Sequence, residues 1–388
     1  MNLSEKLRLS LMEQIDPGKD QEDERILEMI DELILNQEES RCLPVVQKDE
    51  LRRELFYSVR RLDVLQELLD DPEITEIMVN GYSTIYIERH GKIEKYRKAF
   101  PSREKFEDVI WQIVGRCNRV VNEQNPIVDA RLENGDRVNV VMRPVALNGP
   151  ILTIRRFPLE AITMEYLIAC GSITREAAEL MKYLVRERYT IMIGGATGSG
   201  KTTFLNALSA FIPRDERIIT IEDNAELQIQ GIDNLVRLEA REANMENGTE
   251  ITIRDLIRTA LRMRPSRIVI GEVRGEETFE LLAALHTGHA GSISTAHANS
   301  TKDMIHRIET MVLMGTRQLP LMAIRRQIAS GIDILVHLGR DAGGSRRVEE
   351  IAQIMGMEEE EVRVVPLYQW EDGYGLRKKA DLSRRRKE

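Results

Sequence analysis

Residues 194–203 read GGATGSGKTT, and this short stretch decides the fold. It satisfies the pattern G-x-x-x-x-G-K-[ST] of a phosphate-binding loop through Gly195, Gly200, Lys201 and Thr202. An apolar strand is predicted just before it, and a helix is predicted to begin at Lys201. The alternative is a glycine-rich turn that happens to contain a lysine. Because strand, loop and helix follow one another in the required order, the stretch favours an α/β nucleotide-binding fold.

The residue types of this loop explain how it would hold phosphate. Glycines let the backbone turn so that several N–H groups point into one concavity, and the helix N-terminus adds the positive end of a dipole. Lys201 is expected to reach the β- and γ-phosphates, and the Thr202 hydroxyl is expected to bind Mg²⁺. The loop therefore predicts ATP and Mg²⁺ as cofactors. The predicted nucleotide-binding residues are Gly195, Ala196, Thr197, Gly198, Ser199, Gly200, Lys201, Thr202 and Thr203.

Two later apolar strands end in acidic residues. RIITIED ends in Glu222 and Asp223, and RIVIGE ends in Glu272. Ligands bind at the carboxyl ends of strands in an open α/β sheet, so both acids should face the loop. Taken alone, either acid could instead cap a helix or a turn. Beside the loop, Glu272, Glu222 and Lys201 are the predicted catalytic residues, and Glu272 also supports Mg²⁺, directly or through water.

Four of the six histidines lie close together in the sequence, at His286, His289, His297 and His306. A zinc site is disfavoured, because no cysteine is nearby and the segment is predicted to cross a helix, a turn and a strand. We expect His289 and His297 to sense the phosphate, because a neutral imidazole can donate to a phosphate oxygen and rearrange when that oxygen leaves. The alternative is that these histidines have only a structural role, in the core or in turns.

The overall composition limits the class of protein. The chain has 388 residues and a net charge of −9, which disfavours a nucleic-acid binder. No apolar run approaches the roughly 20 residues of a membrane span, and the N-terminus lacks a secretory signal. Its 3 cysteines are far apart and predict reduced thiols. We therefore expect a cytoplasmic chain without a membrane span or a nucleic-acid partner.

The pattern along the chain predicts three segments. Residues 1–60 have helical periodicity and predict a small helical module. Residues 61–158 mix short strands with a helix and predict an α+β domain, followed by a linker near Pro158. Residues 159–388 alternate strands and helices, which predicts a RecA-like α/β domain with a parallel sheet and C-terminal helices. The acidic residues 357–361 are expected in a surface loop or helix end, and the basic residues 384–387 form a terminal tail.

The motifs GATGSGKTT, TIEDNAEL, LRMRPSRIVIGEVRG and TGHAGSISTAHAN occur in this order. Together they resemble the secretion ATPase superfamily of type II and type IV systems. The segments DPEITEIMVNG, DARLENGDRVNVVMRPVALNGPILTIRRF and HRIETMVLMGTRQLPLMAIRRQIASGIDILVHLGR are most similar to the CpaF family, the motors of tight-adherence (Flp-type) pili. The resemblance covers residues 60–370.

The resemblance implies site residues and partners. It places Glu222 in an acidic box, Glu272 as the catalytic acid, and His289 and His297 in a histidine box. It implies nucleotide or subunit-boundary contacts for Arg137, Arg155, Arg262 and Arg264. It further implies a homohexameric ring at the inner face of the cytoplasmic membrane, which drives polytopic inner-membrane platform proteins of a pilus or secretion system.

Other function classes remain open at this point. The motor of a conjugation-type transfer system would have similar catalytic parts. A small-molecule kinase would need an acceptor pocket and a lid, and a nucleic-acid translocase would need basic, aromatic pore loops. A nucleotide-binding adaptor is a further alternative, although the lysine and both acids of a hydrolase are in place.

Overall fold

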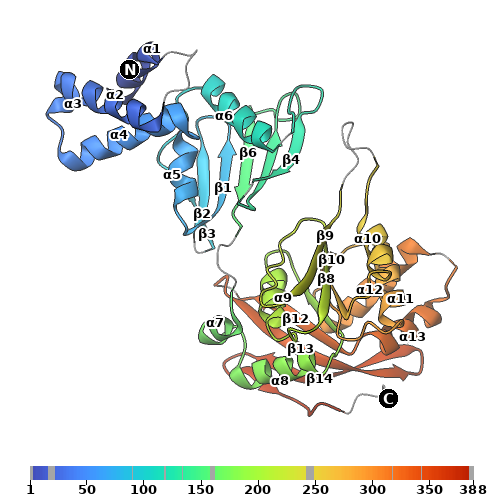
Figure 1. The fold of residues 1–388 in the computed structure, drawn as a ribbon. Helices are drawn as coiled ribbons and strands as arrows, with labels where there is room; N and C mark the ends of the chain where they lie inside the picture. Colours follow the sequence, from blue (N-terminus) through green and yellow to red (C-terminus); the bar gives the residue numbers. More distant parts are fainter. Residues whose placement is uncertain are drawn as a thin grey trace. The chain divides into compact units, whose positions relative to one another are not determined.

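The computed structural model describes residues 3–15, 22–89, 91–117, 119–132, 134–157, 162–241, 249–316, 318–341 and 343–383. Its internal contacts divide the chain into two compact units, Met1–Leu159 and Glu160–Glu388 (Figure 1). The linker expected at Pro158 and the basic tail at residues 384–387 lie outside the described residues. Within the described part of the chain, no helix is both long and apolar enough to cross a membrane.

The first unit begins with helices that pack on one another. They are α1 (Leu3–Gln14), α2 (Asp23–Asn36), α3 (Glu38–Arg41) and α4 (Val45–Arg60). Their shared core includes Leu7, Ile30 and Leu55, whose side chains are almost fully buried. The apolar residues of α2 and α4 recur at helical spacing, so each helix presents one apolar face to the others.

An antiparallel sheet and two helices complete the first unit. The elements are α5 (Val64–Asp70), β1 (Ile74–Asn80), β2 (Ile85–Arg89), β3 (Lys92–Lys95), α6 (Arg103–Arg116), β4 (Ile127–Arg131), β5 (Arg137–Val141) and β6 (Ile151–Arg155). The strand order is β3-β2-β1-β6-β5-β4. Alternate residues of β5 are buried, as expected for a sheet with one face in the core. Phe106 and Ile110 of α6 belong to that core.

The second unit is built on a mixed sheet. Its elements are α7 (Met164–Ala169), α8 (Arg175–Arg186), β7 (Ile191–Gly195), α9 (Lys201–Ser209), β8 (Arg217–Glu222), β9 (Asn234–Glu239), α10 (Ile253–Ala260), β10 (Arg267–Val273), α11 (Glu277–Leu285), β11 (Ile293–Ala296), α12 (Thr301–Gly315), α13 (Leu321–Gly331), β12 (Ile334–Arg340), β13 (Arg346–Glu358), β14 (Glu361–Glu371) and β15 (Gly375–Lys378). The strand order is β15-β14-β13-β12-β7-β11-β10-β8-β9.

Helices cover both faces of this sheet. Residues of α7, α8 and α9 share one core with β7 and β12, whereas residues of α10 to α13 share another core with β8, β10 and β11. All residues of β7 are buried, which is typical of a parallel strand between two helical layers. The predicted α/β fold, with a P-loop domain preceded by an α+β domain, is confirmed (Figure 1).

The carboxyl-terminal part differs from the sequence expectation. The sheet is parallel only from β12 to β9, and β13, β14 and β15 extend it by antiparallel pairing. These strands follow α12 and α13, where the pattern indicated C-terminal helices. The acidic stretch at residues 357–361 spans the end of β13 and the start of β14, and Glu359 and Glu360 form the tight connection between them. Short connections without a helix permit only antiparallel pairing, which explains the change.

Candidate active site

The loop after β7 has the close backbone packing that its glycines allow. A β-carbon on Gly195 would lie 2.3 Å from Oγ of Ser199 and 2.6 Å from the carbonyl oxygen of Leu338. Gly200 has φ +93°, in the left-handed region, directly before α9 begins at Lys201. The residues predicted to bind nucleotide, 195–203, therefore run without a break from the end of β7, through a loop, into the first turn of α9.

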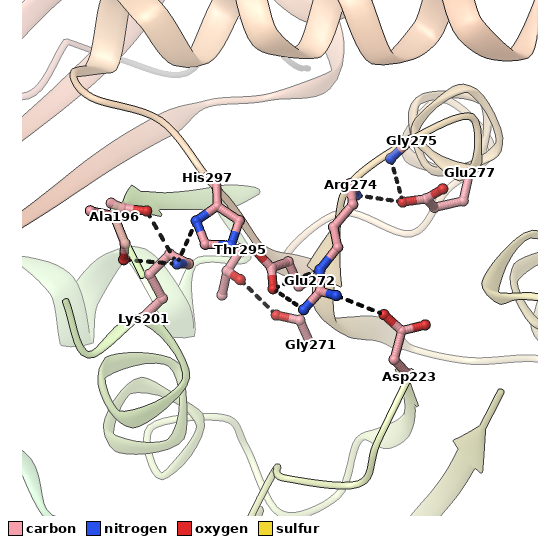
Figure 2. A network of polar contacts seen from close by, with 11 residues as sticks. Ala196, Lys201, Asp223, Gly271, Glu272, Arg274, Gly275, Glu277, Thr295 and His297 are labelled. Atoms are coloured by element: carbon pink, nitrogen blue, oxygen red, sulfur yellow. Dashed lines mark hydrogen bonds and ion pairs between the residues drawn. The ribbon is translucent and has the colours of Figure 1, made fainter. Parts of the chain in front are cut away.

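Lys201 is folded back onto this loop. Its Nζ donates to the carbonyl oxygens of Gly195 and Ala196 at 3.1 and 3.2 Å, and it lies 3.4 Å from Nδ1 of His297 (Figure 2). The residue is only 8% exposed, and burial lowers the pKa of its ammonium group. The lysine is thus held at the loop by groups that phosphate oxygens can replace.

His297 connects Lys201 to Glu272. Its Nε2 lies 2.8 Å from Oε1 of Glu272, on the opposite side of the ring from Lys201. Burial lowers the pKa of His297, which favours the neutral imidazole. The short distance to the carboxylate favours a proton on Nε2, which leaves Nδ1 to accept from the ammonium group, although the angle at Oε1 of Glu272 does not complete a hydrogen bond. Lysine, histidine and glutamate therefore form one continuous polar chain.

Arg274 continues this chain beyond Glu272. Its Nε and NH2 lie 3.1 and 2.8 Å from Oε2 of Glu272, and its NH1 lies 3.7 Å from Oδ2 of Asp223. Glu277 accepts from the backbone N–H of Arg274 and of Gly275, which fixes the turn (Figure 2). Arg274 was not among the predicted site residues, although it stands two residues after Glu272, the spacing of side chains on one face of a strand.

Glu222 is buried beside the same edge of the sheet. Its Oε2 accepts from the backbone N–H of Glu226 and of Leu227 at 2.7 and 2.8 Å. Its Oε1 is buried without a hydrogen-bond partner among the described residues. Burial raises the pKa of this carboxyl group to about 7. A carboxyl group with such a pKa can take up or release a proton near neutral pH.

Other predicted site residues lie elsewhere. His289 precedes β11, at the opposite end of that strand from His297, and its Nδ1 lies 3.2 Å from the carbonyl oxygen of Ala284. Arg262 and Arg264 are exposed between α10 and the start of β10, at the same amino edge of the sheet. Arg137 and Arg155 belong to the first unit, where they are direct partners on β5 and β6.

The oxygen ligands for Mg²⁺ are few. Thr202 stands in the first turn of α9, and Glu272 lies between His297 and Arg274 in the chain of contacts. In the part of the chain that the structure describes, no group of three or more His, Cys, Asp or Glu side chains is arranged to hold a metal. Thr202 and Glu272 offer few oxygen donors. They fit an ion that keeps several waters and is bound chiefly by substrate phosphates, as Mg²⁺ is.

Comparison with known proteins agrees with this arrangement. The family model described as "Type II/IV secretion system protein" matches residues 60–364. A Mycobacterium tuberculosis protein named for conjugal transfer is 34% identical over 316 residues, which cover 80% of this chain and 89% of the relative. The type IV secretion system protein VirB11 of Brucella abortus is 34% identical over 321 residues, covering 75% of this chain and 88% of VirB11.

A solved structure extends the comparison to the fold. The pilus retraction motor PilT with bound ADP aligns with a TM-score of 0.56 at 22% identity, over 76% of this chain and 83% of PilT. The family model covers the α+β domain, the phosphate loop and the strands that carry Glu222 and Glu272. The chain belongs to the family of type II/IV secretion system proteins, and it is an ATPase.

Proposed function

We propose that this protein is a homohexameric, Mg²⁺-dependent motor that hydrolyses ATP to power the assembly of tight-adherence (Flp-type) pili, the role of the CpaF family. The observation that carries the proposal is the continuous chain from Lys201 through His297 to Glu272. It connects the group that binds the terminal phosphates to the acid that acts on water. Hydrolysis at one end of the chain can therefore change contacts at the other.

The roles of the residues follow from this chain. The loop N–H groups and Lys201 bind the phosphates, and Thr202 and Glu272 would hold Mg²⁺, which would neutralise charge that develops on them. Glu272 orients the attacking water. When a γ-phosphate attracts Lys201, His297 loses its contact with the ammonium group and can donate to the phosphate instead. Glu222, with a pKa near 7, accepts the proton that the water releases.

The ring explains the placement of the remaining residues. His289, Arg262 and Arg264 lie at the amino edge of the sheet, away from the phosphate loop of the same chain. In a ring, this edge faces the nucleotide of a neighbouring subunit, where an arginine stabilises the γ-phosphate during transfer. Arg137 and Arg155, in the first unit, are assigned nucleotide contacts by the resemblance alone. Hydrolysis in the ring would drive the platform proteins at the inner face of the cytoplasmic membrane.

A second candidate is the motor of a conjugation-type secretion system. It is favoured by the names of the relatives, since VirB11 and a conjugal transfer protein are each 34% identical to this chain. The catalytic residues serve either system equally. The difference lies in the membrane proteins that the ring drives and in the cargo that they move.

The test combines an ATPase assay with a measurement of mass. We expect a hexamer with Mg-ATP and slow hydrolysis that Lys201→Ala and Glu272→Gln each abolish. A monomer, or transfer of the phosphate to a small metabolite instead of water, would overturn the motor. Deleting the gene then separates the two candidates: loss of surface pili supports the pilus motor, and loss of DNA transfer with pili intact supports the conjugation motor.

A further inference from the structure

The hairpin formed by β12 and β13 lies beside the phosphate loop, on the side away from the catalytic acid. In the sheet, β7 stands between β12 and β11, and Leu338 of β12 is the register partner of Gly195. Glu272 on β10 and His297 after β11 lie on the other side of β7. The loop therefore has two flanks, and only one of them carries the residues that act on the γ-phosphate.

Two arginines of this hairpin reach the glycines of the loop. Nε of Arg340 donates to the carbonyl oxygen of Gly198 at 2.9 Å, and its NH2 lies 2.9 Å from the point where a β-carbon on Gly198 would stand. Arg346 is the direct register partner of Arg340, and its Cδ lies 3.3 Å from the corresponding point on Gly200. Both side chains therefore lie against the phosphate loop.

Arg340 brings a positive charge to this flank. Among the described residues, no carboxylate lies within 4.0 Å of its guanidinium group. The nearby carboxylate of Asp341 accepts from the backbone N–H of Ser345 at 2.8 Å, within the turn. An anion bound beside Arg340 would supply the counter-charge that these described residues do not provide.

The hairpin is also held in place, which favours a binding role over a mobile surface turn. The backbone N–H of Asp341 donates to the carbonyl oxygen of Ser345 and closes the turn. The hydroxyl of Ser172 donates to the carbonyl oxygen of Arg346 at 2.7 Å and ties β13 to the turn before α8. Groups that are positioned before a ligand arrives lose less conformational entropy when they bind it.

The two flanks fix the direction of the nucleotide. The γ-phosphate must lie toward Glu272 and His297, because these residues act on it. The α- and β-phosphates then extend across the loop toward β12. We propose that Arg340 and Arg346 form a cationic clamp that binds the α- and β-phosphates, the part of the substrate that remains in ADP. This inference rests on the proposed ATP hydrolysis.

The clamp has a kinetic signature that distinguishes it from the catalytic residues. Both phosphates remain in ADP, so contacts to them contribute to binding before and after transfer, while the contact to the β-phosphate also stabilises charge that develops on the leaving group. Removing the clamp therefore raises the KM for ATP and the Kd for ADP by similar factors and lowers kcat less than removing a catalytic residue does. Removing Lys201 or Glu272 lowers kcat.

The experiment measures Mg-ADP and Mg-pyrophosphate binding by calorimetry for the wild type, Arg340→Gln, Arg346→Ala and Arg340→Lys. Arg340 is exposed, and Arg340→Gln keeps two of its three methylene groups and a polar end, so we expect the fold to be retained. We expect the Kd of both ligands to rise about tenfold in the first two variants, the scale of one charge-assisted hydrogen bond, and less in Arg340→Lys. Arg363→Ala, an exposed arginine on β14, is the control and should bind like the wild type.

Two kinds of result overturn the clamp. Unchanged ADP affinity in both Arg340→Gln and Arg346→Ala overturns the clamp alone and leaves the proposed ATPase site intact. Weaker ADP binding with unchanged pyrophosphate binding overturns it as well, because the arginines would then contact the nucleoside. If the wild type binds neither ligand, both the clamp and the proposed function are wrong.

Discussion

The γ-carbon of Glu222 lies 3.1 Å from the point where a β-carbon on Gly271 would stand. The two residues belong to neighbouring parallel strands, β8 and β10, and Gly271 directly precedes Glu272. The side chain of Glu222 therefore packs on the backbone that carries Glu272, the proposed catalytic acid. The glycine in RIVIGEVRG allows this close contact between the two acidic strands.

Replacing Gly271 with alanine should displace Glu222 by a few tenths of an ångström. Because Oε2 of Glu222 is held by two backbone N–H groups, the shift strains those hydrogen bonds. We expect kcat to fall about tenfold and the free energy of unfolding to fall by about 1–3 kcal/mol. ATPase assays and thermal unfolding measure both. Gly115→Ala, on α6 with nothing within 4 Å of the new carbon, is the control. Unchanged kcat in Gly271→Ala would show that the contact has no catalytic consequence.

Replacing Glu222 with glutamine should stabilise the protein while inactivating it. The pKa of this carboxyl group rises from 4.5 to about 7 on folding, so its ionised form opposes folding. The stability of the wild type is unaffected below about pH 4.5, falls as the pH rises toward 7, and is lower by up to about 3 kcal/mol above it. Glutamine carries no charge and keeps an oxygen to accept from Glu226 and Leu227.

Denaturant unfolding of the wild type and of Glu222→Gln, at about pH 5 and about pH 8, tests this linkage. The variant should gain stability over the wild type at the higher pH, and most of that gain should vanish at the lower. A gain of equal size at both values would mean that ionisation of Glu222 does not limit stability. The ATPase activity of the variant should be near background at either pH.

Replacing Glu272 with glutamine should separate binding from turnover. Glutamine has the shape needed to remain beside His297 and Arg274, so the Kd for ATP should stay within a few-fold of the wild-type value. It cannot orient and polarise water as a carboxylate does, and we expect turnover to fall at least about 100-fold. Steady-state hydrolysis and nucleotide binding give both numbers. Turnover at the wild-type rate would exclude Glu272 from the chemical step.

Replacing His297 with alanine should lower kcat about 10–100-fold without weakening ADP binding, because ADP lacks the phosphate that this residue senses. His289→Ala is the matched comparison, since His289 lies at the far end of β11. If the ring places His289 at a neighbouring site, its variant should lose activity only in the assembled hexamer. Equal effects of both variants in a monomeric preparation would contradict the different roles given to them.

Much of the second unit follows from local sequence. The loop 195–203 and the strands that end in Glu222 and Glu272 are each contiguous, and parallel strands gather their carboxyl ends at one edge. The contact between Lys201 and His297 could be identified only in the folded structure, because 96 positions in the sequence separate the two residues. The position of the hairpin arginines beside the loop could not be predicted from local sequence, because Arg340 approaches Gly198 only through pairing of β12 with β7.

The histidines illustrate a second limit. His289 and His297 flank one strand, and the sequence gives them equal chemical character. Strand direction separates them, because only the residue after the strand lies at the carboxyl edge. The burial of individual acids could also not be predicted from the sequence. Glu222 and Asp223 are adjacent, yet Glu222 is only 3% exposed and Asp223 is exposed to solvent.

The position of Lys201 bears on how the enzyme resets between cycles. Its ammonium group has protein partners of its own, the carbonyl oxygens of Gly195 and Ala196 and the ring of His297. A buried cation with such partners does not depend on phosphate alone for its hydrogen bonds. In the proposed motor, the lysine would exchange these partners for phosphate oxygens and return to them as product leaves, which would make release of ADP easier.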